Sequence, residues 1–152
     1  MFLSFFASHL SAQCNVQTNE RDDGVKVRFI RPDRVGLCDR FVLGLSMQTN
    51  GKQFFVVTLS VFETDAVRLQ GKLTLFFENN KSSTFELYRS EITTVKGSPA
   101  TISIFIANEN GLANISNSDI KMAVVQLEDN TYQTISVKIN ADILKKQYNC
   151  LK

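Results

Sequence analysis

The chain has 152 residues, a formal net charge of +2 and 43% hydrophobic residues. This length and this balance fit a single globular domain. The charge is too small to indicate binding to nucleic acid or to an anionic membrane surface, so we expect no nucleic-acid partner.

Residues 1–13, MFLSFFASHLSAQ, contain no Lys, Arg, Asp or Glu and end in small and polar residues. This pattern is typical of the apolar and cleavage regions of a secretory signal peptide. The basic region that normally comes first is missing, so we interpret the segment as a truncated signal peptide. In addition, Leu10 stands at the minus-three position for cleavage after Ala12, where a small residue is normal, so the cleavage pattern is met only loosely. An amphipathic or buried first segment of the domain is the alternative. The pattern predicts a secreted or periplasmic protein.

No segment of the sequence predicts an integral membrane span. A helix needs about 20 apolar residues to cross a bilayer. The apolar run at the beginning of the chain is shorter than this, and no later run is long enough.

Period-two alternation of apolar and polar residues predicts short β-strands from Val25 onward. Enrichment in Val, Ile, Thr and Phe supports the same interpretation. Asn-Gly at 50–51 predicts a type I′ hairpin turn, and further turns are expected at 79–82 and 129–130. The expected strands are 25–29, 41–48, 54–62, 72–78, 84–89, 101–107, 121–128 and 131–139.

Only the end of the chain has a helical pattern. Asn140 is suited to cap a helix over 141–148, with Ile143, Leu144 and Tyr148 on its buried side. The segment 108–111 is expected to break the chain between two strands. We therefore predict that 14–152 form one all-β domain, an antiparallel immunoglobulin-like β-sandwich with a short C-terminal helix. A lipocalin-like up-and-down β-barrel is the alternative.

The chain has three cysteines, Cys14, Cys38 and Cys150, so one is left unpaired or has another use. Cys14 follows the expected signal peptide directly, where a lipoprotein carries its lipid anchor. Gln13 departs from that pattern, because a small residue normally precedes the lipidated cysteine. If Cys14 were modified, Cys38 and Cys150 would remain as a disulfide pair. The sequence alone leaves the connectivity open.

The sequence contains no pattern of a catalytic, cofactor-binding or metal site. The only histidine, His9, lies in the expected signal peptide, which removes His-based catalysis and His-containing zinc sites from the mature chain. Glu63 and Asp65 are the carboxylate pair that a glycosidase would require. Solvated strand ends explain this pair better, so we expect no enzyme and no cofactor.

Three sets of residues are candidates for a binding surface, each with a simpler structural explanation. The basic set could meet an acidic group, although interleaved acids and a solvated face are the simpler interpretation. The aromatic set could line a groove, although packing in the core is the alternative. The loop asparagines are of interest because loops carry function on rigid sheets. The sets are Lys26, Arg28, Arg31, Arg34 and Arg40; Phe54, Phe76, Tyr88 and Phe105; and Asn50, Asn79, Asn80, Asn108 and Asn110.

These observations favour a non-enzymatic binding or adhesion module that contacts a protein or a glycan outside the cytoplasm. The alternative is a carrier that holds a small apolar ligand inside a β-barrel. The sequence identifies neither the ligand nor the partner.

Overall fold

The computed structural model describes residues 14–152, and the expected signal peptide at 1–13 lies outside the described residues. Ten strands and two helices lie within the described range. The strands are β1 (Gln17–Glu20), β2 (Lys26–Phe29), β3 (Asp33–Leu37), β4 (Phe41–Thr49), β5 (Phe54–Phe62), β6 (Leu69–Phe77), β7 (Ser82–Val95), β8 (Ser98–Ala107), β9 (Ile120–Leu127) and β10 (Tyr132–Ser136), and the helices are α2 (Glu109–Asn117) and α3 (Ile143–Leu151).

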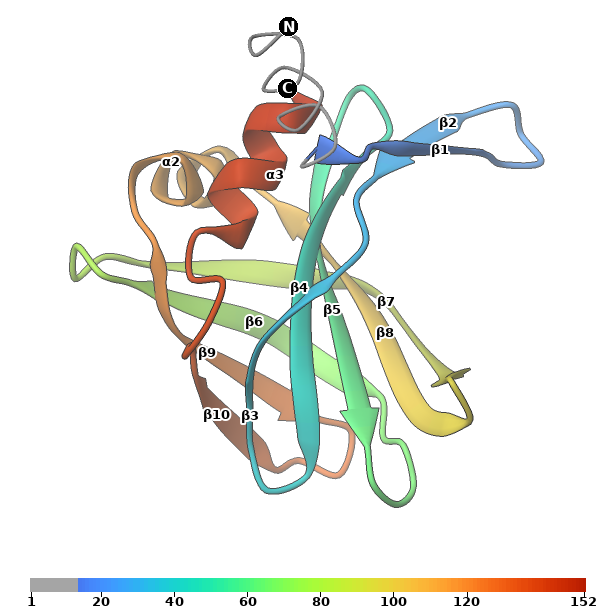
Figure 1. Cartoon of the computed structure of the whole chain (residues 1–152), viewed down its shortest axis with the longest axis vertical. Coiled ribbons are helices and arrows are strands. Elements are labelled where there is room, and N and C mark those ends of the chain that lie inside the picture. Colours follow the sequence, from blue (N-terminus) through green and yellow to red (C-terminus); the bar gives the residue numbers. More distant parts are fainter. Residues whose placement is uncertain (1–13) are drawn as a thin grey trace, which may run out of the picture.

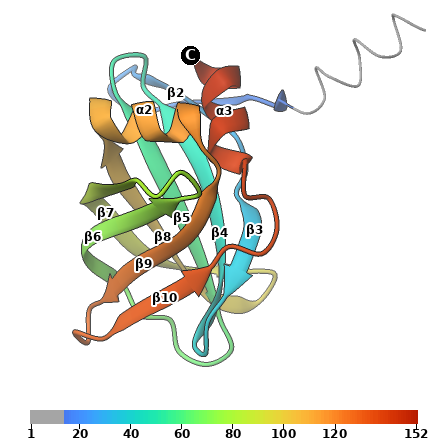
Figure 2. The same ribbon diagram turned by 90° about the vertical axis from the view of Figure 1, so that its left-hand side faces the viewer.

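All ten strands belong to one antiparallel sheet, in the order β1-β2-β4-β5-β8-β7-β6-β9-β10. β3 lies off this path and pairs with β4. The sheet is strongly curved but is not closed into a barrel (Figures 1 and 2). The prediction of an antiparallel all-β domain is confirmed. The immunoglobulin-like sandwich is not confirmed, because the strands follow one hydrogen-bonded path rather than two.

The hydrophobic core lies inside the curve of the sheet. Inward-facing residues such as Leu43, Leu75, Phe85 and Phe105 are fully buried there. Helices α2 and α3 lie across one end of the curve and contribute Ile115 and other residues to the same core (Figure 2). Because each strand alternates its side chains between two faces, one face of the sheet builds this core and the other faces outward.

The three predicted hairpin turns are present, although the first has a different type. Asn50 N donates to Gln53 O at 3.2 Å, so Gly51 and Lys52 form the loop. Gly51 has a φ of 92°, whereas Asn50 does not have a positive φ. A positive φ at the first loop position alone is typical of type II′ rather than type I′. The Asn50 side chain instead accepts hydrogen bonds from Lys52 N and Gln53 N.

Helix α2 corrects the expectation that 108–111 only break the chain. Asn108 is its N-cap, and the Asn108 side chain accepts a hydrogen bond from Gly111 N at 2.7 Å. Asparagine is favoured at this position because its oxygen satisfies one of the free N–H groups of the first turn. A Cβ at Gly111 would collide with the Phe85 ring, so this glycine lets the helix lie close to β7.

Helix α3 confirms the C-terminal helix but begins later than expected. It runs from Ile143 to Leu151, with Asp142 rather than Asn140 at the N-cap position. Asn140 instead has a φ of 54°, and its Nδ2 donates to Arg34 O at 2.8 Å. Asparagine tolerates this left-handed conformation better than most residues, which explains its place in the turn before the helix. Neither helix of the described part is long and apolar enough to cross a membrane.

The disulfide joins Cys14 to Cys150, with 5.7 Å between the two Cα atoms, and Cys38 is a free thiol. The Cys38–Cys150 pair, which the sequence offered for the case that Cys14 is modified, is therefore not the pair that forms. Cys38 N donates to Phe41 O and closes the β3–β4 turn, and this turn lies at the end of the sheet opposite to α3 (Figure 1). A sulfur in a disulfide cannot also carry a lipid, so this pairing and lipidation of Cys14 exclude each other in one molecule. Lipidation of Cys14 stays an alternative prediction.

Candidate functional site

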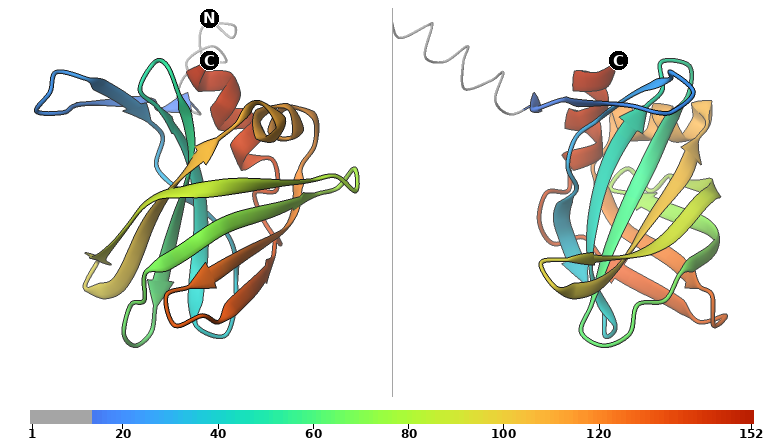
Figure 3. Two further views of the ribbon diagram at one scale, coloured as in Figure 1. Left: turned by 180° about the vertical axis from the view of Figure 1, so that it is seen from behind. Right: turned by 90° about the vertical axis from the view of Figure 1, so that its right-hand side faces the viewer.

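The hairpin of β1 and β2, here called the arm, projects from the end of the sheet at which α3 lies (Figure 3). It pairs with the rest of the sheet only where Arg28 lies opposite Thr49 and Phe29 opposite Gln48. A guanidinium nitrogen of Arg28 also donates to Leu151 O at 2.6 Å. The arm is thus held by a short ladder, by the disulfide just before it, and by a contact to the C-terminal end of α3, where a cation is favourable.

Beside the arm, the outer face of the sheet is unusually apolar. Outward-facing residues of β5 lie directly opposite isoleucines of β8 in three cross-strand pairs: Phe55–Ile106, Val57–Ile104 and Leu59–Ile102. An antiparallel sheet with one solvated face normally carries polar residues there. The apolar pairs therefore mark a face that favours contact with something other than water.

A β-bulge extends this face onto β7. The register between β7 and β8 shifts between Leu87 and Arg89, so Tyr88 is the extra residue. Tyr88 is 55% exposed, and its ring lies 5.6 Å from that of Phe55. Bulges re-aim side chains and are common beside functional sites. Here the bulge places an aromatic ring with a polar tip at the border of the apolar face.

Two adjoining hollows lie between the arm and this outer face, and we call them together the arm groove. Their volumes are about 370 and 310 Å³, within the range of ligand sites. Arg21, Val27 and Gln48 line both hollows. The apolar floor and walls are formed by Val27, Phe29, Ile30, Phe55, Val57, Ile102, Ile104 and Ile106.

Polar groups at the arm groove are amides, arginines and the hydroxyls of Ser46 and Tyr88, without a carboxylate in its lining. The Gln48 side chain lies where the two hollows meet and makes no hydrogen bond within residues 14–152. Arg21 and Arg89 pair with Asp23 at 3.4 Å and Glu91 at 2.6 Å. The guanidinium of Arg31 forms no ion pair with the described residues. The groove thus combines an apolar floor, a free amide and one unneutralised cation.

No family model, no curated protein and no solved structure matches this chain. The function has to be argued from the chemistry of the site.

A third hollow lies between the beginning of α3 and the segment before β3, with a volume of about 250 Å³. Its lining has both signs of charge, with Asp33 and with Lys146 paired to Asp142 at 3.3 Å. Because its lining is polar and its charges are partly neutralised, it is a weaker candidate for binding than the arm groove.

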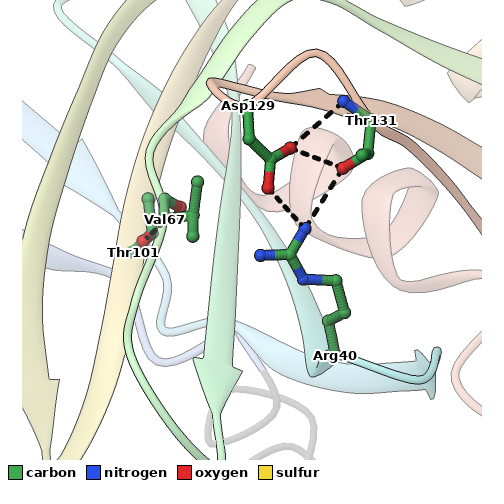
Figure 4. Close-up of polar contacts among 5 residues, drawn as sticks. All are labelled: Arg40, Val67, Thr101, Asp129 and Thr131. Atoms are coloured by element: carbon green, nitrogen blue, oxygen red, sulfur yellow. Dashed lines mark hydrogen bonds and ion pairs between the residues drawn. The ribbon is translucent and has the colours of Figure 1, made fainter.

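The ion pair that accompanies a clearly lowered pKa joins two turns rather than lining the arm groove. Arg40, in the β3–β4 turn, donates to the Asp129 carboxylate at 2.7 Å and to the Thr131 hydroxyl at 3.1 Å (Figure 4). The Thr131 hydroxyl and N–H also donate to Asp129, at 2.6 and 3.1 Å. Hydrogen bonds from Thr131 and then from Arg40 lower the pKa of Asp129 from 3.8 to about 2. This contact ties the β3–β4 turn to the β9–β10 turn.

The structure distributes the predicted basic set over several places. Arg28 contacts α3 and Arg40 contacts Asp129, as described above. Arg31 lines the arm groove, while Arg34 lines a hollow between β3 and β10. The five residues therefore do not form one anion site.

Of the predicted aromatic set, only Tyr88 lines the arm groove. Phe105 is fully buried in the core, and the Phe54 ring packs 4.9 Å from that of Tyr148 in α3. Phe29 and Phe55 are the aromatic residues of the groove lining that sequence reasoning missed, and Phe55 carried a signal. The signal was its position in a strand that is apolar on both faces.

Most of the predicted loop asparagines have structural roles. Asn50 closes its turn and lines the arm groove, and Asn108 caps α2. The Asn79 side chain accepts from Lys81 N, and that of Asn110 accepts from the Ser83 hydroxyl. Asn80 is exposed in the β6–β7 turn with a φ of 67°.

Glu63 and Asp65 are both exposed in the segment between β5 and β6. Within residues 14–152, no three His, Cys, Asp or Glu side chains gather where they could hold a metal ion. Thr58 and Ser60 point into the sheet interior, and their buried hydroxyls have no hydrogen-bond partner in the described part.

Proposed function

We propose that this protein is a non-enzymatic binding module that acts outside the cytoplasm, with the arm groove as its binding surface. The occupant is an extended segment of a partner protein that carries apolar side chains and a carboxylate. The observation that carries the proposal is the outer face of β5 and β8, where the Phe55–Ile106 and Val57–Ile104 pairs and Ile102 form the floor of a groove.

The polar groups support a peptide as the occupant. Gln48 offers a donor and an acceptor to a peptide backbone in the middle of the groove. Arg31 offers an unpaired guanidinium to a carboxylate, which is the geometry that arginine recognises best. A glycan is less well supported, because sugar recognition normally uses exposed aromatic faces and Tyr88 is the only exposed one in the lining.

The extracytoplasmic part of the proposal is supported by the signal-like segment 1–13 and by the Cys14–Cys150 disulfide. Structural disulfides are favoured in oxidising compartments. The proposed mode of action resembles that of an immunoglobulin-like module only in that a rigid sheet presents a binding surface. The carrier alternative has less support, because large core side chains such as Phe77, Phe85 and Phe105 fill the interior of the curve.

The proposal is tested by selecting short random peptides on the immobilised, disulfide-bonded protein and measuring their affinities by calorimetry. We expect enriched peptides to combine apolar residues with Asp or Glu. Arg31→Glu should weaken their binding at least about tenfold, since a charge-assisted hydrogen bond contributes about 1.5–3 kcal/mol. Ile104→Ser should weaken it by a similar factor through the lost apolar contact.

Two matched variants control for general effects. Arg68→Glu reverses a charge in an exposed segment, and Ile92→Ser removes an exposed isoleucine, both outside the groove lining. Neither should change the affinities. Binding of sugars or of small apolar molecules instead of peptides would contradict the proposed occupant. Peptides that bind both groove variants as tightly as the wild type would also contradict it.

A further inference from the structure

The two ends of the curved sheet approach each other at β3 and β10 without pairing as strands. On one side of this seam, Val35 O accepts hydrogen bonds from Lys138 N at 2.8 Å and Ile139 N at 3.3 Å. A Cβ at Gly36 would collide with Ser136 O, so the two backbones touch there. On the other side, the contact of Arg40 with Asp129 bridges the two turns (Figure 4).

Over the contact of Gly36 with Ser136, the outer surface has a hollow of about 470 Å³, here called the seam hollow. It is lined by residues of β3, by outward-facing residues of β10 and by the segment that follows β10. Its side chains include Arg34, Leu37, Thr134, Ser136, Lys138 and Ile139. The topology ends at β10, and this strand pairs with no strand on its other side within the described part of the chain.

The hydrogen-bond pattern shows which backbone groups face the seam. Leu127 N donates to Thr131 O and Val137 N donates to Lys121 O. Paired residues of antiparallel strands alternate between bonded and non-bonded positions. Tyr132 and Thr134 therefore direct their N–H and C=O groups away from β9. In the same way, the bond from Cys38 N to Phe41 O places the backbone groups of Leu37 away from β4.

The side chains at the seam are apolar and basic. Leu37 and Ile139 are 56% and 50% exposed, and Tyr132 on the same strand edge is 68% exposed. Arg34 and Lys138 form no ion pair within residues 14–152, and the lining contains no carboxylate. A second copy of this chain would bring like charges together at a symmetric interface. An acidic partner is complementary instead.

We propose that the seam hollow is a second binding site, distinct from the arm groove, which accepts an extended peptide segment that carries both apolar and acidic side chains. The segment lies across the outer face of the seam, meets the free backbone groups of Tyr132 and Thr134, and places apolar side chains on Leu37 and Ile139. Its carboxylates meet Arg34 and Lys138. The exposed backbone edge supplies affinity and the side chains supply specificity.

The test uses two short synthetic peptides, one of alternating Glu and Val and one of alternating Lys and Val. Amide hydrogen exchange of the full disulfide-bonded chain is followed by NMR with each peptide. We expect the Glu-Val peptide to slow exchange of the Tyr132 and Thr134 amides by at least about tenfold. The Lys-Val peptide should leave these amides unprotected. The double variant Arg34→Glu, Lys138→Glu should reverse the preference between the two peptides.

Independent variants separate this site from the arm groove. Thr134→Pro removes an edge N–H and should abolish protection of the Tyr132 amide, whereas Arg31→Glu, which disables the arm groove, should leave the protection of both amides intact. Equal protection by both peptides, or none at millimolar peptide, overturns the proposal. Protection that rises with protein concentration in the absence of peptide also overturns it and assigns the seam to self-association.

Discussion

The arm groove and the seam hollow are both basic-edged hollows on one curved sheet, but they are built in opposite ways. The arm groove lies on a fully paired part of the sheet and recognises through side chains such as Phe55 and Ile104. The seam hollow exists because the sheet is incomplete, and it offers backbone groups of Leu37 and Thr134. A single fold can thus present two kinds of binding surface. One is specific through the shape of its side chains, and the other gains affinity from exposed backbone groups at a strand edge.

The largest expected effect comes from removing the disulfide, which should affect the two sites differently. The double variant Cys14→Ser, Cys150→Ser removes a cross-link with a sequence separation of 136 residues. We expect the free energy of unfolding to fall by up to about 5 kcal/mol on the chain-entropy model, measured by urea denaturation. Because the disulfide anchors the arm, peptide binding in the arm groove should be lost while amide protection at the seam persists.

Cys38→Ser is the matched control for this cross-link. Its thiol is free and half-buried in the β3–β4 turn, so both the stability loss and the change in binding should be small. Equal losses in the Cys38 and Cys14 variants would contradict the disulfide assignment and restore the pairing that the sequence first indicated.

An intermediate effect is expected at the point where β3 and β10 touch. Gly36→Ala places a Cβ against Ser136 O and Ile135 Cγ2, so a strand must shift. We expect a loss of about 1–3 kcal/mol by urea denaturation and a wider seam hollow. Gly44→Ala on β4 is the control, since its Cβ would make contacts of 3.4 Å, at the edge of ordinary packing. If Gly36→Ala is as stable as Gly44→Ala, the two strands are not held together at this point.

The smallest effect concerns the other boundary of the seam. Because the folded pKa of Asp129 is about 2, below its ordinary 3.8, the interaction stabilises the fold above pH 3.8 and is lost as pH falls through about 2. Thr131→Val should raise this pKa toward 3.8, as followed by the carboxyl ¹³C shift. Thr94→Val, at an exposed position on β7, should leave it unchanged. A wild-type pKa near 3.8 would contradict the hydrogen bonds that Thr131 and Arg40 donate to Asp129.

Residue patterns predicted most of the long strands and the hairpin turns. Phe54–Phe62 and Ser98–Ala107 match expected segments closely because alternation and β-branched residues act over a few neighbouring positions. β3 was not predicted because Pro32, Asp33 and Gly36 are residue types that are rare in strands, and because a bulge at Val35 interrupts its register. Helix α2 was missed because its Asn-rich sequence is a weak helix former and depends on the cap at Asn108.

The candidate sites were harder to predict than the strands. The apolar residues of the arm groove could be predicted from a strand that is apolar on both faces. Their position beside the arm could not be predicted, because it depends on contacts between segments that are distant in the sequence. The seam depends on which strand ends the sheet, and that is a property of topology rather than of local sequence. The disulfide pairing could not be predicted for the same reason, since the fold places Cys38 and Cys150 at opposite ends of the sheet.

The Cys14–Cys150 bond also determines what a protease would leave behind. The arm turn at 21–24 is exposed, and Arg21 offers a cleavage site for trypsin-like enzymes. A molecule nicked there keeps its N-terminal piece attached to α3 through the disulfide, so it runs as one species on a non-reducing gel and as two after reduction. Cleavage in the arm would therefore alter the groove without releasing any part of the protein.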